Sequence, residues 1–306
     1  MGAGRRLVIV AALGSVISAA HVSPRQDAAQ AEPRRILVSH VARAVQPGEV
    51  VLVRVTTPSP AEAVTGDSAS GPLRFYRTTD PQAWEAVIGL DLNTKAGPFR
   101  LTIHTVLGGT TADIPYGLNV TPKRFPTRLI TVDERFVNPP ASELPRIERE
   151  ARRTAAILAI ASPTRLWDGP FLPPVPGPAT SSFGRISVIN GLRRSPHTGT
   201  DFQAAVGTPI KAPNSGIVVL SEPLYYSGDT VIIDHGLGVF SFLAHLSRRD
   251  VAAGDHVSAE TVVGLSGATG RITGPHLHWS VRVADARVDP ISMLDVLGHG
   301  AERLLR

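Results

Sequence analysis

The sequence predicts a mainly β protein, with an N-terminal β-sandwich-like domain, a helical connector and a second, mainly β domain at the C-terminus. Short runs rich in Val, Ile and aromatic residues, separated by Gly- and Pro-containing turns, fill residues 34–122 and 180–294. One amphipathic helical pattern lies between them, in residues 123–179. A chain of 306 residues is long enough for two domains that each bury a core.

The first 20 residues form a separate segment. A short basic region, MGAGRR, precedes the apolar run LVIVAALGSVISAA, which ends in small residues. This order is typical of a secretory signal peptide, with cleavage near Ala20, and the alternative is an uncleaved membrane anchor. Both interpretations predict an exported protein, in the periplasm or associated with the cell envelope. No later apolar run reaches the roughly 18 residues of a membrane span, so we expect no stable span in the mature chain.

The composition excludes several classes of protein and site. A hydrophobic content of 42% and a charged content of 19% are typical of a soluble globular chain. The absence of cysteine excludes disulfides, thiol nucleophiles and thiolate ligands, so a transition metal must be held by His, Asp or Glu. The net charge of +5 comes from scattered arginines without a basic stripe or interleaved aromatic residues, so we expect no nucleic-acid partner.

Residues 34–122 contain five short runs with the composition of strands, namely ILVSH, EVVLVRVT, LRFYR, WEAVIGLDL and FRLTIHTV. Several short strands at regular spacing predict a small antiparallel sandwich. His40 and His104 lie singly within these patterns, and we interpret both as structural residues. This domain therefore offers no candidate chemistry.

The connector, residues 123–179, contains the one predicted helix. The segment around TRLITVDERFVNPP is interpreted as a strand or extended linker that ends at two prolines. Apolar residues then recur at three- and four-residue spacing opposite a charged face, which predicts a helix over about 142–160, capped near Ser142. We expect this helix to bridge the two domains.

Six of the ten histidines lie between residues 197 and 278, inside the second domain. In GPHLHWSV, strand alternation places His276 and His278 on one face, while the apolar residues that alternate with them can seal a core. In PHTGTDF, His197 and Asp201 point the same way along an extended segment, and Gly199 leaves space between them. Two same-face pairs in a cysteine-free β domain suggest a metal site.

His245 ends the hydrophobic strand FSFLAHL, whose other face carries Phe240, Phe242 and Ala244. Two histidines and one carboxylate would form a three-ligand zinc set with one position left for water. The other histidines could then accept a proton or stabilise an oxyanion, which is the chemistry of metal-assisted amide hydrolysis. Spacing alone leaves open which histidine of the GPHLHW pair binds the metal.

Three motifs, His-x-x-x-Asp, His-Leu-Ser and His-x-His, follow one another over about 110 residues, in the segments HTGTDFQAAVGTPIKAPNSGIVV, VIIDHGLGVFSFLAHLS and GLSGATGRITGPHLHWSV. Together these segments resemble the catalytic domain of the M23 peptidases, the lysostaphin/LytM-type zinc endopeptidases that cut peptidoglycan peptides. The upstream sandwich and helical connector are similar to the N-terminal region of exported members.

The resemblance implies a compact antiparallel β-sheet domain with the site in a groove. It implies Zn²⁺ as the cofactor, with His197, Asp201 and His278 as ligands and with His245 and His276 as the catalytic residues. Peptidoglycan peptides are the implied substrate.

Leu243 departs from the resemblance, because such segments commonly carry tyrosine there, and we interpret the leucine as a change of subsite packing. An alternative function is a catalytically weak or inactive regulatory module that activates other cell-wall hydrolases. Such modules usually lack a zinc ligand or a catalytic residue, whereas all five motif positions are present here. A structural adhesin or carbohydrate-binding sandwich would explain the N-terminal domain but not the histidines.

Overall fold

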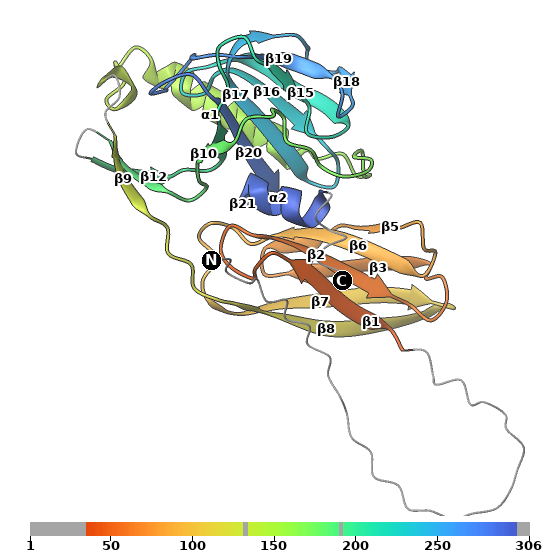
Figure 1. The fold of residues 1–306 in the computed structure, drawn as a ribbon. Helices are drawn as coiled ribbons and strands as arrows, with labels where there is room; N and C mark the ends of the chain where they lie inside the picture. Colours follow the sequence, from red (N-terminus) through yellow and green to blue (C-terminus); the bar gives the residue numbers. More distant parts are fainter. Residues whose placement is uncertain (1–34, 131–133, 190–191, 299–306) are drawn as a thin grey trace, which may run out of the picture.

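The computed structural model describes residues 35–130, 134–189 and 192–298, which form two β domains joined by a connector (Figure 1). The predicted signal peptide, residues 1–20, lies outside the described residues. Within the described ranges, no helix is long and apolar enough to cross a membrane.

The N-terminal domain is a sandwich of two four-stranded antiparallel sheets, as the sequence predicted. Alternation along β2 turns Val51, Val53 and Val55 inward, where they are fully buried against Leu101 and Ile103 of the facing sheet. One sheet contains β1 (Leu37–Ala42), β2 (Val50–Thr56), β6 (Ala83–Gly89) and β5 (Phe75–Arg77). The other contains β4 (Gly71–Leu73), β3 (Ala63–Ser68), β7 (Gly97–Leu107) and β8 (Thr110–Val120).

The C-terminal domain is built on one ten-stranded antiparallel sheet, which confirms the predicted fold class. Its main path runs β10 (Ala179–Ser181), β13 (Thr200–Phe202), β20 (Leu277–Val283), β17 (Val239–Arg249), β16 (Gly228–Asp234), β15 (Gly216–Leu224) and β18 (His256–Val257). Three further strands extend it, namely β14 (Pro209–Lys211), β19 (Val262–Ser266) and β21 (Ala286–Val288).

The connector adds a strand and a helix to the C-terminal domain. Strand β9 (Thr127–Ile130) pairs in parallel with β11 (Ile186–Ile189), and β11 pairs with β12 (Leu192–Pro196). A short 3-10 helix, η1 (Glu134–Phe136), follows β9. Figure 1 shows the yellow β9 running from the sandwich to the upper domain.

Helix α1 (Leu144–Ala159) lies close to the predicted bounds. The expected cap at Ser142 was wrong: the N-cap residue is Glu143, which makes no side-chain capping hydrogen bond. The predicted apolar stripe does pack, because Ile157 and Leu158 contact a cluster of fully buried strand residues. These are Leu220, Ile232 and Phe240.

Helix α2 (Pro290–Leu297) was not predicted. Its start signal is clear in retrospect, because Asp289 accepts a hydrogen bond from the backbone of Ile291 at 3.0 Å and a proline occupies the first turn. Eight residues are too few for the helical period to stand out from the neighbouring strand patterns. The helix lies between the two domains (Figure 1).

The domain interface combines ion pairs with close packing. Arg43 of the sandwich lies 2.8 Å from Glu49 and 2.7 Å from Asp289, and Arg287 of β21 lies 2.8 Å from Asp91. Burial alone would raise the pKa of the Asp91 carboxyl, but hydrogen bonds from Arg287 lower it to about 2. The pair is therefore ionised at neutral pH and ties the sandwich to the sheet of the second domain.

A substitution at Gly89 of β6 tests how closely the two domains pack at this interface. A Cβ at this position would lie 2.6 Å from the Cβ of Ala286 and 3.0 Å from Cγ1 of Val288. Because these atoms belong to the other domain, we expect Gly89→Ala to lower the free energy of unfolding by about 1–3 kcal/mol, measured by chemical denaturation.

Gly117→Ala is the matched control, since a Cβ there meets nothing within 4 Å. We expect it to change the free energy of unfolding by no more than about 0.5 kcal/mol. Equal stability of the two variants would mean that the domains do not pack closely at Gly89.

Candidate metal centre

Strand register brings the predicted ligands together. Asp201 of β13 lies directly opposite His278 of β20, so the two side chains share a face, with Oδ1 and Nδ1 2.9 Å apart. Nε2 of His197 lies 3.1 Å from the same Asp201 oxygen and 3.0 Å from Nδ1 of His278. His197 was expected on one strand with Asp201, but β13 begins only at Thr200, and His197 reaches the site from the loop after β12.

Gly199 is required by the position of the His278 ring. A Cβ on Gly199 would lie 2.7 Å from Nε2 of His278 and 2.5 Å from the carbonyl oxygen of Trp279. The space that the sequence predicted between His197 and Asp201 is thus filled by the second imidazole, which completes the triad.

The hydrogen bonds around the triad leave three acceptor atoms facing one point. Nδ1 of His197 lies 3.3 Å from the carbonyl oxygen of Ser182, which can only accept, so Nε2 carries the lone pair. The Nε2–H group of His278 donates to Ser280 Oγ at 2.7 Å. Nδ1 of His278 therefore carries the lone pair, which points at Asp201. Three acceptors that converge in this way repel one another unless a cation lies among them.

The triad fits a metal ion in number, chemistry and spacing. The three ligand atoms of His197, Asp201 and His278 lie 2.9–3.1 Å apart. Ligand bonds of about 2.0–2.2 Å, as zinc makes to imidazole and carboxylate, suit a triangle of roughly this size. Within the described residues, this is the group of His, Asp and Glu side chains that could hold a metal ion.

The electrostatics favour the protonation states that bind a metal. Burial alone would raise the pKa of Asp201, but the surrounding imidazoles of His197, His276 and His278 hold it well below its usual range. Burial lowers the pKa of His278, so its imidazole is neutral at physiological pH. A carboxylate and a neutral imidazole are the forms that act as ligands.

His245 reaches the site through an irregularity in β17. Ala244 lies opposite His278, so regular alternation would turn His245 to the core face with Leu243. The backbone of His245 instead adopts φ +65°, and the register between β16 and β17 shifts at this point. Its ring therefore lies on the triad side, with centroid distances of 5.1 Å to His276 and 5.8 Å to His278.

Both additional histidines are oriented by backbone carbonyl groups. Nδ1 of His245 donates to the carbonyl oxygen of Thr269 at 2.8 Å, and Nδ1 of His276 donates to that of Gly274 at 2.7 Å. Each ring thus keeps Nε2 as its acceptor, and Nε2 of His276 lies 3.4 Å from Asp201 Oδ1. Burial, with a smaller contribution from the neighbouring histidines, lowers the pKa of His245 to about 3, so this imidazole is neutral at physiological pH.

Leu243 and His235 face away from the triad. Leu243 is fully buried in the main core, so the expectation that it alters subsite packing was wrong. His235 is also buried, with its nitrogens 2.8 Å from the carbonyl oxygen of Ser215 and 2.9 Å from Ser241 Oγ, which is a structural role. The sequence did not indicate that the carbonyl of Thr269 orients His245 or that the hydroxyl of Ser280 orients His278. Alternation had placed Ser280 on the correct face, but no sequence signal identifies an orienting backbone carbonyl.

Comparison with known proteins places this site in a family. The model for peptidase family M23 matches residues 195–290. Peptidoglycan DD-endopeptidase ShyA of Vibrio cholerae is 44% identical over 91 residues, which cover 30% of this chain and 21% of that protein. DD-carboxypeptidase/endopeptidase Mpg of Neisseria meningitidis is 38% identical over 118 residues, which cover 36% of this chain and 27% of that protein. The matched segments are thus a minor part of both relatives.

One solved structure matches most of the chain. It is a candidate peptidase M23 from Pseudomonas aeruginosa, with 34% sequence identity and a TM-score of 0.64. The match covers 82% of this chain and 95% of that one, so it includes the sandwich and the connector as well as the site-bearing domain. This relative is matched along nearly its whole length, and the family model spans the candidate metal centre. The chain therefore belongs to peptidase family M23, a family of metallopeptidases.

Proposed function

We propose that the protein is a zinc-dependent endopeptidase that hydrolyses peptide bonds in peptidoglycan stem peptides or cross-links. The observation that carries the proposal is the convergence of Nε2 of His197, Oδ1 of Asp201 and Nδ1 of His278 to within 2.9–3.1 Å of one another. The names of the curated relatives, a peptidoglycan DD-endopeptidase and a DD-carboxypeptidase/endopeptidase, support the substrate class.

His197, Asp201 and His278 would hold the ion, and zinc suits a set of two imidazoles and one carboxylate with a fourth position left open. When bound, Zn²⁺ supplies Lewis-acid chemistry, which polarises a carbonyl group and lowers the pKa of water towards neutrality. Ser280 and the carbonyl of Ser182 orient the two ligand rings through their second nitrogens.

His276 and His245 would move protons at Nε2. Each ring donates Nδ1–H to a fixed carbonyl oxygen, so the proton taken up during the reaction must go to the other nitrogen. Once protonated, the same Nε2 becomes a donor, and it can stabilise an oxyanion or protonate the leaving amine. We assign proton transfer to His276, because its Nε2 lies 3.4 Å from the ligand oxygen of Asp201.

The proposal includes export to the periplasm or cell envelope and a division of the chain into a sandwich (34–122), a connector (123–179) and a peptidase domain from residue 180. Helix α2 extends the last domain beyond the predicted end at residue 294. A regulatory module without activity is the alternative, and the intact set of three ligands and two further histidines argues against it.

The metal assignment predicts a loss of zinc from two single variants. Purified wild-type protein should contain about one zinc per chain by elemental analysis. His278→Ala and Asp201→Ala should each lose most of it, because two ligands remain. His256→Ala, at an exposed histidine of β18, serves as the control and should keep its zinc. Stoichiometric zinc in both ligand variants would rule out this triad as the metal site.

The catalytic assignment predicts a separation of metal binding from activity. His276→Ala should retain zinc but release peptide termini from purified peptidoglycan at least about 100-fold more slowly, because general acid–base catalysis contributes a factor of that order. Unchanged hydrolysis by this variant would exclude His276 as the proton-transfer group. If the wild-type, zinc-loaded protein releases no termini from any wall preparation, the regulatory alternative replaces the enzyme.

A further inference from the structure

The loop between β19 and β20, residues 267–276, passes beside the bulge in β17 that turns His245 towards the triad. Its two ends are joined by an isolated β-bridge between Gly267 and His276. The residues between these ends lie outside the strands, so the position of the loop depends on individual contacts rather than on a strand ladder. Thr269, near the start of the loop, makes such contacts with both strands at the bulge.

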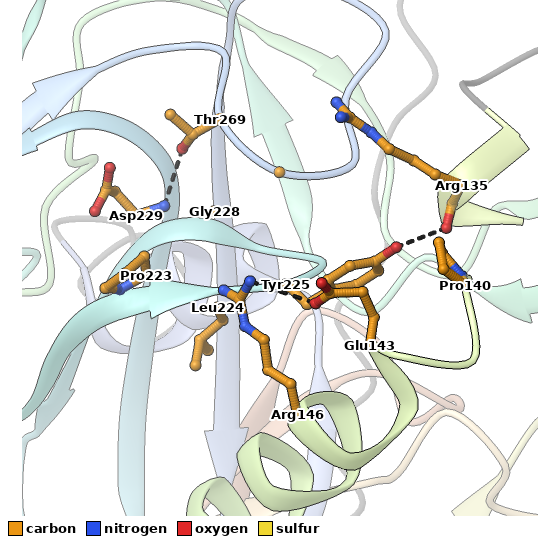
Figure 2. Close-up of a pocket in the computed structure, with 11 residues that line it drawn as sticks. Arg135, Pro140, Glu143, Arg146, Pro223, Leu224, Tyr225, Gly228, Asp229 and Thr269 are labelled. Atoms are coloured by element: carbon orange, nitrogen blue, oxygen red, sulfur yellow. Dashed lines mark hydrogen bonds and ion pairs between the residues drawn. The ribbon is translucent and has the colours of Figure 1, made fainter.

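The hydroxyl group of Thr269 bridges β16 and β17. Asp229 and Leu246 are partners in the register of these two strands, and the register shifts directly beyond Asp229. The Thr269 hydroxyl accepts a hydrogen bond from the backbone N–H of Asp229 at 2.9 Å, as Figure 2 shows, and donates one to the carbonyl of Leu246 at 2.7 Å. One side chain thus satisfies a backbone donor of one strand and a backbone acceptor of the other at the irregularity.

The carbonyl group of the same threonine orients the ring of His245. It accepts the hydrogen bond from Nδ1 of His245 at 2.8 Å. Leu246, which receives the Thr269 hydroxyl, is the next residue along the chain, so the threonine also fixes the backbone of His245 from its C-terminal side. A shift of Thr269 would therefore move both the backbone and the ring of the histidine.

Glycine residues let the loop approach the strands this closely. A Cβ on Gly228 would collide with the hydroxyl oxygen of Thr269, and a Cβ on Gly270 would collide with the backbone nitrogen of Gly228. Both glycines have positive φ values, +64° and +77°, which glycine adopts readily. The backbone N–H of Arg271 donates to the carbonyl of Tyr226 at 2.8 Å, which ties the loop to the hairpin between β15 and β16.

We propose that Thr269 is a positioning residue for the catalytic histidine His245. Its hydroxyl holds the bulged backbone, and its carbonyl keeps the ring proton on Nδ1, so that Nε2 carries the lone pair. The inference rests on the proposed endopeptidase function and adds to it a residue outside the three histidine motifs. A threonine with a merely structural role would affect stability but not the state of the His245 ring.

The kinetic test separates the hydroxyl group from the rest of the side chain. Thr269→Val removes the hydroxyl at nearly constant size, whereas Thr269→Ser keeps it. With a purified cross-linked peptidoglycan peptide, Thr269→Val should lower kcat at least about 10-fold, because misplacing a catalytic group by about 1 Å can cost about 100-fold. KM and zinc content should stay close to those of the wild type. Thr269→Ser should retain most of kcat.

Thr57→Val is the matched control, because the hydroxyl of the buried Thr57 in the sandwich also lies between two backbone groups. Its oxygen is 2.7 Å from the carbonyl of Ser59 and 3.1 Å from that of Gln82. This variant should keep the wild-type kcat even if its stability falls. A wild-type kcat in Thr269→Val, or an equal loss of kcat in Thr269→Val and Thr269→Ser, would overturn the proposal.

A second measurement does not depend on activity. NMR spectra of protein with isotopically labelled histidine should show the proton of His245 on Nδ1, protected from exchange with solvent, and His245→Asn identifies this signal by its loss. Thr269→Val should lose the protection, and Thr57→Val should keep it. If the wild-type protein hydrolyses no peptide but shows this pattern, the endopeptidase function fails while the positioning of His245 by Thr269 stands. Absence of the protected signal from the wild-type spectrum overturns the proposal without any variant.

Discussion

The convergence of three hydrogen-bond acceptors on one point is the constraint on which the rest of this structure depends. Asp201 is only 7% exposed, and its carboxylate faces the lone pairs of two imidazoles. Such an arrangement is unfavourable without a cation, so the surrounding fold must hold the groups in place. The pairing of β13 with β20, the missing side chain at Gly199 and the fully buried Trp279 behind the strand all serve this purpose.

His245 shows how the fold departs from regularity beside the candidate metal centre. A positive φ at a non-glycine residue costs on the order of 1–2 kcal/mol. The backbone N–H of His245 and its Nδ1 each donate to a carbonyl oxygen, of Ser227 and of Thr269, and these contacts offset the strain. The bulge also lets β17 change partners, from β20 before His245 to β19 after it.

The sandwich with helix α2, and helix α1 of the connector, pack on opposite faces of the site-bearing sheet. Helix α2 and Val50 of the sandwich share a core with Leu243 and Trp279, whose side chains point away from the metal centre. Helix α1 covers the other face, which carries His278. The sandwich thus supports the sheet from behind, whereas helix α1 packs on the face that carries the candidate metal centre.

Local sequence patterns were sufficient to predict the β architecture, the connector helix and the pairing of histidines with a carboxylate, because strand and helix periods are local properties of the backbone. They correctly placed His276, His278 and Ser280 on one side of a strand whose other side, around Trp279, is buried. The contact between His197 and His278, 81 residues apart in the chain, with Nε2 and Nδ1 3.0 Å from each other, is a result of the tertiary fold. The tertiary fold also decided the orientation of His245, since alternation alone directs that residue into the core. Strand register, a bulge and the docking of α1 all depend on contacts between distant segments, and no local pattern encodes such contacts.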